Sequence, residues 1–150
     1  MNILFVCTGN TCRSPMAEAL LKHKAKSFNA LKLKVKSSGL SVLYGSSVAL
    51  ETKQLLKDYG IQIRHIPTQI NKKLINWADL ILTMTDDQAG AIKNVTEKNN
   101  VYSLGEYVGY DNILDPYGRG IQSYKVTLAQ IDNYLDKLIE KLLFLKKVNK

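Results

Sequence analysis

The chain has 150 residues, of which 45% are hydrophobic and 23% charged, with nine glycines and three prolines. This composition excludes disordered and fibrous proteins, and the length predicts one domain spanning residues 1–150 that buries about 70% of its unfolded surface. The formal net charge is +8, but the lysines are scattered and no nucleic-acid-binding motif accompanies them. We therefore expect a solvated, lysine-rich surface and no nucleic-acid partner.

No apolar run reaches membrane-spanning length, and Met1-Asn2 opens directly into the first predicted strand without a basic signal-peptide region or cleavage site. Two cysteines are too few for a structural disulfide framework. We therefore expect a cytoplasmic protein with no membrane partner.

The hydrophobic pattern predicts alternating strands and helices. Strands are expected at residues 2–6, 80–82 and 101–104. A further strand is expected at Leu31, Leu33 and Val35, which alternate with lysines, and Ser37-Ser38-Gly39 is expected to end it and to start a loop. Helices are expected at 15–28, at 48–59 ending at Gly60, at 71–78, after the capping-box sequence Thr85-x-x-Gln88, and near the C-terminus. The alternation predicts a three-layer, doubly wound α/β fold with a four-stranded parallel sheet flanked by helices.

The C-terminal segment carries an apolar seam with steps of three and four residues, formed by Tyr124, Leu128, Ile131, Leu135, Leu138, Leu142 and Leu145. This spacing also occurs in coiled coils, so a dimer helix is an alternative. We favour a core helix and a monomer, because a single domain must cover that face of its sheet.

A candidate functional loop lies between the first predicted strand and the helix that follows it. It reads Val6-Cys7-Thr8-Gly9-Asn10-Thr11-Cys12-Arg13-Ser14-Pro15. A short loop between a strand and a helix N-terminus points backbone N–H groups and the positive end of the helix dipole at one spot. The sequence therefore predicts an anion site with Cys7 at its base.

Each residue type has a role in such a site. Thiols beside a helix N-terminus and a cation are ionised at neutral pH, so Cys7 is expected to be a nucleophilic thiolate. Arg13 can hold two phosphate oxygens with its planar fork of donors. Ser14 can cap the helix or donate to the thiolate, and Pro15 suits the first helical position. The amides of Thr8, Gly9, Asn10, Thr11 and Cys12 form the cradle, with Gly9 free to adopt a positive φ.

Residues 6–18 resemble the signature loop of the low-molecular-weight protein tyrosine phosphatases. Thr11, where many members carry an aliphatic residue, makes the chain most similar to their bacterial protein-arginine phosphatase branch. The sequence Asp115-Pro116-Tyr117-Gly118 resembles the general-acid loop of that family. By itself an Asp-Pro pair could be a simple turn, but the resemblance implies that Asp115 is the catalytic acid.

The resemblance implies a metal-independent reaction in which Cys7 attacks phosphorus, Arg13 binds the phosphoryl oxygens and Asp115 protonates the leaving atom. It also implies that Ser37 and His65 lie in a buried network behind the loop with Asn10, whose alternative role is an Asx turn. Cys12 is expected either to fill space or to form a disulfide with Cys7 under oxidation. A zinc site built from Cys7, Cys12, His23 and His65 lacks recognisable ligand spacing.

A deep pocket would admit the long side chains of phosphotyrosine or phosphoarginine in protein substrates. Thr11 favours the polar, planar guanidinium of phosphoarginine, and Tyr117 is expected at the mouth of the pocket. Phosphotyrosine is the alternative substrate.

Two other functions use a similar loop. A thioredoxin-coupled arsenate reductase needs further cysteines, and none follows Cys12. A non-catalytic phosphopeptide-binding module would have no need of both Cys7 and Asp115. The joint presence of these two residues favours an enzyme.

Overall fold

The computed structural model describes residues 1–150, and at its centre is a four-stranded sheet in the order β2-β1-β3-β4, with all neighbouring strands parallel. The strands are β1 (Asn2–Cys7), β2 (Lys34–Gly39), β3 (Leu80–Thr83) and β4 (Val101–Ser103). The helices are α1 (Arg13–Ala25), α2 (Leu50–Asp58), α3 (Lys72–Trp77), α4 (Asp86–Lys93), α5 (Leu104–Val108) and α6 (Ile121–Val148), with a 3₁₀ helix, η1, at Asn29–Leu31. The predicted α/β architecture with a four-stranded parallel sheet is confirmed.

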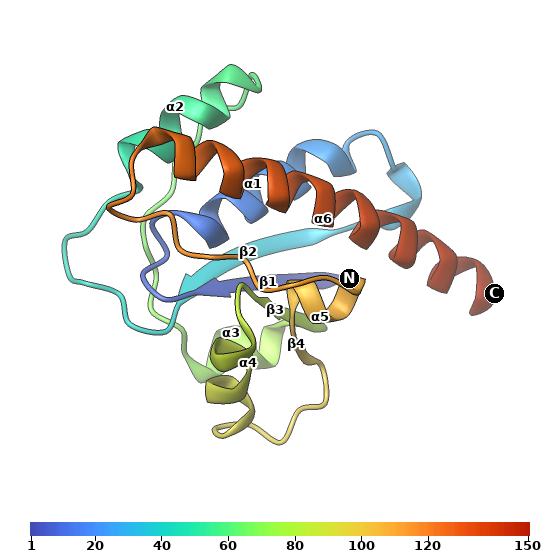
Figure 1. Ribbon diagram of the computed structural model, residues 1–150. Coiled ribbons are helices and arrows are strands. Elements are labelled where there is room, and N and C mark those ends of the chain that lie inside the picture. Colours follow the sequence, from blue (N-terminus) through green and yellow to red (C-terminus); the bar gives the residue numbers. More distant parts are fainter.

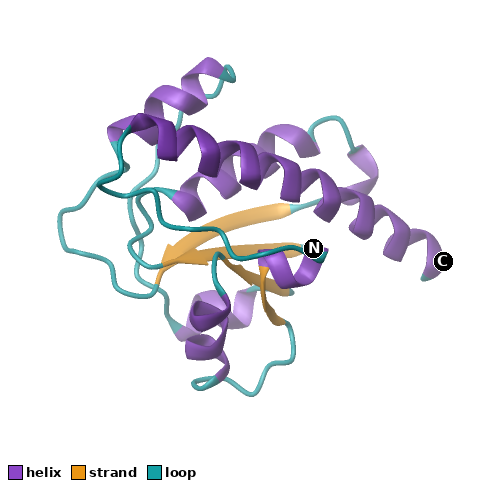
Figure 2. Ribbon diagram, in the orientation of Figure 1, coloured by secondary structure: helices purple, strands orange, loops and turns teal.

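Helices cover both faces of the sheet, α1 and α6 on one side and α3 and α4 on the other (Figure 1, Figure 2). Successive side chains of a strand point to opposite faces, and β1 follows this rule. Ile3 and Phe5 belong to the core under α1 and α6, whereas Leu4 and Val6 belong to the smaller core under α3 and α4. All four side chains are completely buried. This double burial explains why β1 reads as a continuous apolar run.

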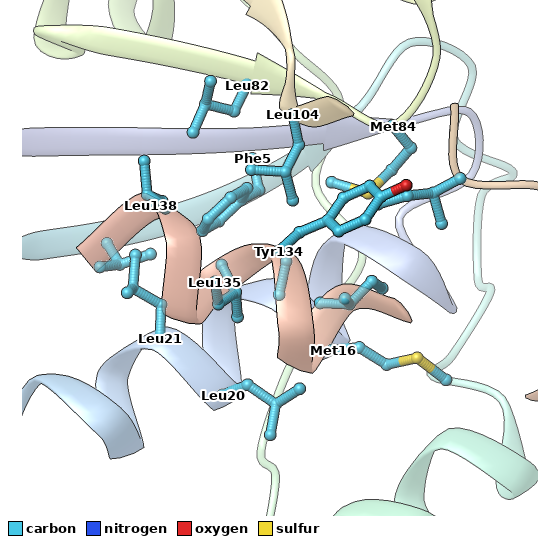
Figure 3. Close-up of a cluster of buried hydrophobic side chains, with 14 of the residues drawn as sticks. Phe5, Met16, Leu20, Leu21, Leu82, Met84, Leu104, Tyr134, Leu135 and Leu138 are labelled. Atoms are coloured by element: carbon cyan, nitrogen blue, oxygen red, sulfur yellow. The ribbon is translucent and has the colours of Figure 1, made fainter. Parts of the chain in front are cut away.

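The larger core is formed where α1 and α6 cross β1 (Figure 3). Leu20 and Leu21 of α1 meet Leu135 and Leu138 of α6, with Phe5 of β1 beside them. The predicted seam of α6 is therefore packed inside the molecule, and the core-helix interpretation is confirmed for most of its length. The exception is Leu145, which is exposed near the end of the helix. Although α6 has 28 residues, no helix in the structure combines the length and hydrophobicity needed to cross a bilayer.

The second strand lies further along the chain than the sequence predicts. Leu31 ends η1, and the strand begins at Lys34 and continues through Ser37, Ser38 and Gly39. These last three residues pair in register with Phe5, Val6 and Cys7 of β1. The strand ends at Gly39, but Ser37, Ser38 and Gly39 are paired within it instead of starting the loop as predicted, because tertiary hydrogen bonds satisfy polar residues that favour a turn in isolation.

Both ends of α1 also differ from the prediction, and the structure contains one helix that was not predicted. Helix α1 begins at Arg13, so Pro15 is its third residue and not its first. This is tolerated because the first turn of a helix has no internal partner for the missing N–H. The helix ends at Ala25 instead of Phe28, and the short helix α5 was not predicted. The capping box of Thr85 and Gln88 is present as predicted.

Candidate active site

The loop between β1 and α1 lies at the carboxyl ends of the parallel strands, where such sheets bind ligands. Cys7 is the last residue of β1, and Arg13 is the first residue of α1. A glycine at the end of β2 allows the loop to approach this closely. A Cβ atom on Gly39 would lie only 2.7 Å from the carbonyl oxygen of Thr8 and 3.0 Å from the amide nitrogen of Asn10. Any larger residue at position 39 would therefore push the loop away.

The loop bends at Asn10, which has a φ of 56°, and not at Gly9, whose φ is not positive. The expectation that Gly9 supplies the left-handed residue was wrong. Asparagine tolerates this conformation because its side chain can form local hydrogen bonds, and here it forms several. Its Nδ2 donates to Ser14 Oγ at 2.8 Å and to Ser37 Oγ at 3.0 Å, and the residue is completely buried. Asn10 therefore fixes the curvature of the loop from behind.

The acceptor oxygen of Asn10 extends this network to a distant segment. It accepts hydrogen bonds from the backbone N–H of Thr68 at 2.9 Å and contacts His65 Nε2 at 2.8 Å. Ser37 donates to Glu18 Oε2 at 2.6 Å, and His65 Nδ1 lies 3.5 Å from the same oxygen. Burial lowers the pKa of His65, and the nearby Glu18 carboxylate partly opposes this effect. Ser37 and His65 thus lie behind the loop as expected.

Two members of this network were missed by the sequence analysis. Glu18 lies one helical turn after Ser14, so the helical spacing could have placed it on the same face. Thr68 contributes a backbone N–H, for which the sequence carries no side-chain signal. Its position depends on the tertiary fold alone.

Cys7 is only 3% exposed, and its sulfur lies at the base of the loop. Ser14 Oγ is 2.9 Å from the sulfur, and the backbone N–H of Asn10 donates to it at 3.3 Å. Ser14 Oγ accepts from Asn10 Nδ2, and its own proton can point at the sulfur or at the more distant carbonyl oxygen of Ser38, at 3.4 Å. No side chain caps the N-terminus of α1, so Ser14 does not act as a cap. These donors and the helix N-terminus all favour a negatively charged sulfur.

Arg13 is a nearly buried cation beside this sulfur, with an exposed fraction of 4%. Its Nη1 donates to the carbonyl oxygen of Ile113 at 2.9 Å, which fixes the direction of the guanidinium. Its Nη2 lies 3.6 Å from Asp115 Oδ2, and the Asp115 side chain is 52% exposed. The backbone N–H of Tyr117 donates to the other oxygen of Asp115 at 3.1 Å. The site therefore combines a fixed, nearly buried cation with a partly exposed carboxylate, and both line the same cavity as Cys7.

A cavity of about 390 Å³ opens above the loop. Its floor and walls include Cys7, Thr8, Gly9, Thr11, Cys12, Arg13, Asp115 and Tyr117. Asn10 and Ser14, which were expected among the substrate-binding residues, are completely buried and contact the sulfur instead. Another part of the wall comes from residues 41–49, namely Ser41, Leu43, Ser46, Ser47 and Ala49, and no sequence pattern indicated this contribution.

Cys12 points toward α6, and its sulfur lies 3.3 Å from the hydroxyl of Tyr124. Burial raises the pKa of Cys12, which hydrogen bonds to Tyr124 and Thr11 only partly offset. Tyr124 is likewise shifted to a higher pKa by burial, so it keeps its proton. Cys12 is therefore held as a neutral thiol, whereas hydrogen-bond donors surround the sulfur of Cys7. Both cysteines are free.

Alkylation at neutral pH is expected to label Cys7 faster than Cys12, because the thiolate is the reactive form. Ser14→Ala should slow the labelling of Cys7 by roughly tenfold, since one charge-assisted hydrogen bond contributes about 1.5–3 kcal/mol. Mass spectrometry after timed iodoacetamide treatment measures both rates. Ser123→Ala, at a partly buried serine on α6 away from the cavity lining, serves as the control. Equal labelling of Cys7 in the two variants would contradict the role of Ser14.

A parallel α/β fold that places a cysteine and an arginine around one loop between a strand and a helix N-terminus is typical of cysteine-dependent phosphatases. The chain belongs to the low molecular weight phosphotyrosine protein phosphatase family, whose model matches residues 2–149.

The chain is also similar to individual phosphatases over most of its length. The chain is 39% identical to a protein-arginine-phosphatase from Geobacillus stearothermophilus over 144 residues, 93% of this chain and 95% of that protein. It is 36% identical to the low molecular weight protein-tyrosine-phosphatase PtpB from Staphylococcus haemolyticus over 140 residues, 92% of this chain and 97% of the other. A solved structure of the YwlE arginine phosphatase, a cysteine-to-serine mutant with a phosphorylated active-site serine, superposes with a TM-score of 0.89 at 34% identity and covers 95% of both chains.

Proposed function

We propose that this protein hydrolyses phosphoarginine residues of other proteins through a phosphocysteine formed on Cys7. The observation that carries the proposal is a threonine, Thr11, on the wall of a cavity that has the cysteine and arginine at its floor. Similarity to a protein-arginine-phosphatase at 39% identity supports the substrate class. The phosphorylated serine in the mutant relative supports a covalent intermediate at the nucleophile's position.

In the first step, the Cys7 sulfur attacks phosphorus and an S–P bond forms as the P–N bond to the substrate guanidine breaks. Arg13 and the loop amides bind the three phosphoryl oxygens, which carry the charge of the transition state. Asp115 gives its proton to the departing nitrogen, so arginine leaves as a guanidinium cation. The position of Asp115 at the cavity entrance, 3.6 Å from Arg13, suits this role.

In the second step, a water molecule attacks phosphorus on the side from which arginine left. Asp115, now a carboxylate, accepts a proton from this water. The S–P bond breaks, the Cys7 thiolate is restored, and inorganic phosphate leaves. Cys7, Arg13, Asp115 and the loop amides are the only groups that these two steps require.

Thr11 is proposed to select between substrates. It lies on the cavity wall with its hydroxyl 3.5 Å from the Cys12 sulfur. A guanidinium retains several N–H donors after phosphorylation, and an apolar wall would leave them without partners. The hydroxyl of Thr11 and the carbonyl oxygen of the protonated Asp115 side chain can accept from these donors. An aliphatic residue at position 11 would favour a flat aromatic ring instead.

Thr11→Ile is expected to lower kcat/KM for a phosphoarginine peptide by about tenfold to a hundredfold and to raise it for the matched phosphotyrosine peptide. The estimate follows from leaving one or two buried donors unpaired, at about 1–3 kcal/mol each. Phosphate release from the two peptides measures the change. Thr11→Ser, which keeps the hydroxyl, is the control and should retain the phosphoarginine preference. No gain toward phosphotyrosine in the isoleucine variant would remove the argument from Thr11.

Phosphotyrosine is the second candidate substrate, and the lining of the cavity mouth favours it. Leu43 and the exposed ring of Tyr117 both line the cavity, and an aromatic substrate ring could pack between them. Similarity to PtpB, which is named a protein-tyrosine-phosphatase, is consistent with this alternative. Faster turnover of phosphotyrosine than phosphoarginine peptides by the unmodified protein would favour it.

We further propose that the protein acts in the cytoplasm as a monomer. A thiolate nucleophile needs a reducing compartment to remain free. The apolar seam of α6, which could have served as a dimer contact, is largely buried in the core of the same chain.

A further inference from the structure

The cavity and the chain segments next to it carry exposed apolar side chains, of which Leu43 and Tyr117 line the cavity. Leu43 and Tyr44 come from the loop before α2, Leu50 begins α2, and Tyr117 and Ile121 lie just before and at the start of α6. Tyr44 and Leu50 are almost wholly exposed, at 107% and 78%. Exposed apolar residues grouped around one opening are typical of a binding surface, whereas isolated ones are common everywhere.

A second hollow continues this surface away from the cavity. Its volume is about 410 Å³, and it is lined by Leu50, Glu51, Lys53, Gln54, Lys57 and Ile121. On one side, Ala49 lines the cavity and the next residue, Leu50, lines the hollow. On the other side, Tyr117 lines the cavity and Ile121 lines the hollow. Helix α2 starts beside the start of α6 (Figure 1), so the hollow lies next to the cavity, and we call the two together the α2 groove.

The α2 groove is attached firmly to the phosphate loop. The backbone N–H of Ala49 donates to the carbonyl oxygen of Thr11 at 3.0 Å. This bond joins the beginning of α2 to the residue proposed to select the substrate. A polypeptide held in the groove would therefore be placed in a fixed position relative to the cavity.

The charges of the groove change along its length. Glu51 lies at the end near the cavity, and Lys53 and Lys57 lie further along α2. None of the ion pairs in the structure involves either lysine. Two like charges four residues apart on a helix repel each other, and an acidic ligand would relieve that repulsion.

We propose that the α2 groove binds the substrate polypeptide beside the phosphorylated residue, and that it prefers an apolar side chain near that residue followed by acidic side chains. Leu50 and Ile121 would contact the apolar side chain, and Lys53 and Lys57 the acidic ones. This inference rests on the proposed protein phosphatase function and adds a substrate sequence preference to it.

The geometry of α2 sets the spacing of the preferred sequence. With a rise of about 1.5 Å per residue, Lys57 lies about 10 Å along the helix from Leu50. An extended peptide covers about 3.3 Å per residue, so this length corresponds to about three residues. The preferred substrate therefore carries its acidic residues within about three positions of the apolar one.

The test compares two phosphoarginine peptides that differ only in the flanking residues, one with leucine followed by aspartates and one with serine followed by lysines. The unmodified protein should have the lower KM for the acidic peptide. In Lys53→Glu/Lys57→Glu this preference should be lost, with kcat/KM for the acidic peptide lowered by about tenfold, mainly through KM. Turnover of free phosphoarginine, which does not reach the groove, should be unchanged.

The matched control is Lys72→Glu/Lys73→Glu, which makes the same change in net charge on exposed residues of α3, on the opposite face of the sheet. It should leave the peptide preference intact. Leu50→Ser/Ile121→Ser should weaken selection of the leucine without affecting free phosphoarginine. Circular dichroism and the melting temperature of each variant check that the fold is retained.

An equal effect of the two charge-reversal variants on the peptides, or no effect of either, would overturn the groove proposal. Failure of the phosphoarginine proposal is seen separately, as a lack of turnover of free phosphoarginine by the unmodified protein. In that case the same flanking sequences are tested on phosphotyrosine peptides, with an aryl phosphate as the small substrate. Loss of the acidic preference in Lys53→Glu/Lys57→Glu would then still support the groove.

Discussion

Cys7→Ala is expected to reduce phosphate release by a factor on the order of 10⁴ to 10⁶, as removal of a covalent nucleophile does in other enzymes. The sulfur lies at the base of the cradle, with donors from Ser14 and Asn10 at 2.9 and 3.3 Å. No other nucleophile in the cavity has comparable support, because the neighbouring Cys12 is held as a neutral thiol beside Tyr124. Alanine is chosen because it offers no side-chain oxygen that could take over the attack. Phosphate release from a phosphopeptide measures the effect.

Cys12→Ala is the matched control, because Cys12 is buried to nearly the same extent, at 4% exposure against 3% for Cys7. Cys12 contributes its backbone N–H to the cradle, and alanine keeps that group. Its loss of activity should therefore be smaller by orders of magnitude. Comparable activity in the unmodified protein and Cys7→Ala would contradict the proposed phosphocysteine and every step that follows from it.

Asp115→Asn is expected to lower kcat for a phosphoarginine peptide by about 10²- to 10⁴-fold, the usual contribution of a general acid. Its carboxylate lies at the entrance of the cavity, where it can reach both the leaving nitrogen and the attacking water. An asparagine would keep the hydrogen bond from the Tyr117 N–H but could not transfer a proton. The loss in the first step should be much smaller for nitrophenyl phosphate, whose leaving group departs without a proton. Burst kinetics with this substrate separate the two steps.

Asp111→Asn provides the control for Asp115, because Asp111 lies in the same segment before α6 and is exposed. No hydrogen bond or ion pair joins its carboxylate to the cavity. Its activity should remain close to that of the unmodified protein. An equal loss in the two variants would show that the charge of this segment matters, and not proton transfer by Asp115.

The sequence predicted most secondary structure because hydrophobic periodicity and capping signals are local. Strands β1 and β3 read as short apolar runs because both of their faces are buried. Thr85 and Gln88 form the capping box that their spacing indicates. The errors fell where tertiary contacts override local preference, as at Ser37, Ser38 and Gly39, which extend β2 because they pair with β1.

In the candidate site, too, the local sequence predicted the residues of the loop, whereas distant contacts decided its backbone conformation. Cys7, Arg13 and Thr11 were predicted from one continuous segment, and all three line the cavity. The left-handed residue was assigned to Gly9 on intrinsic preference, yet Asn10 adopts this conformation because distant partners, including Thr68, satisfy its side chain. Intrinsic backbone preference is worth only about 1–2 kcal/mol per residue, so a few buried hydrogen bonds can outweigh it.

The sequence by itself determined the alternation of strands and helices, the position of the phosphate loop and the residue types at its base, since these depend on neighbours within one or two turns. Only the tertiary structure decided which distant groups complete the site: the Thr68 N–H behind the loop, the wall from residues 41–49, and the α2 groove. Such contacts join segments separated by tens of residues. Their geometry is fixed by how the helices pack on the sheet, and no local pattern in the chain encodes it.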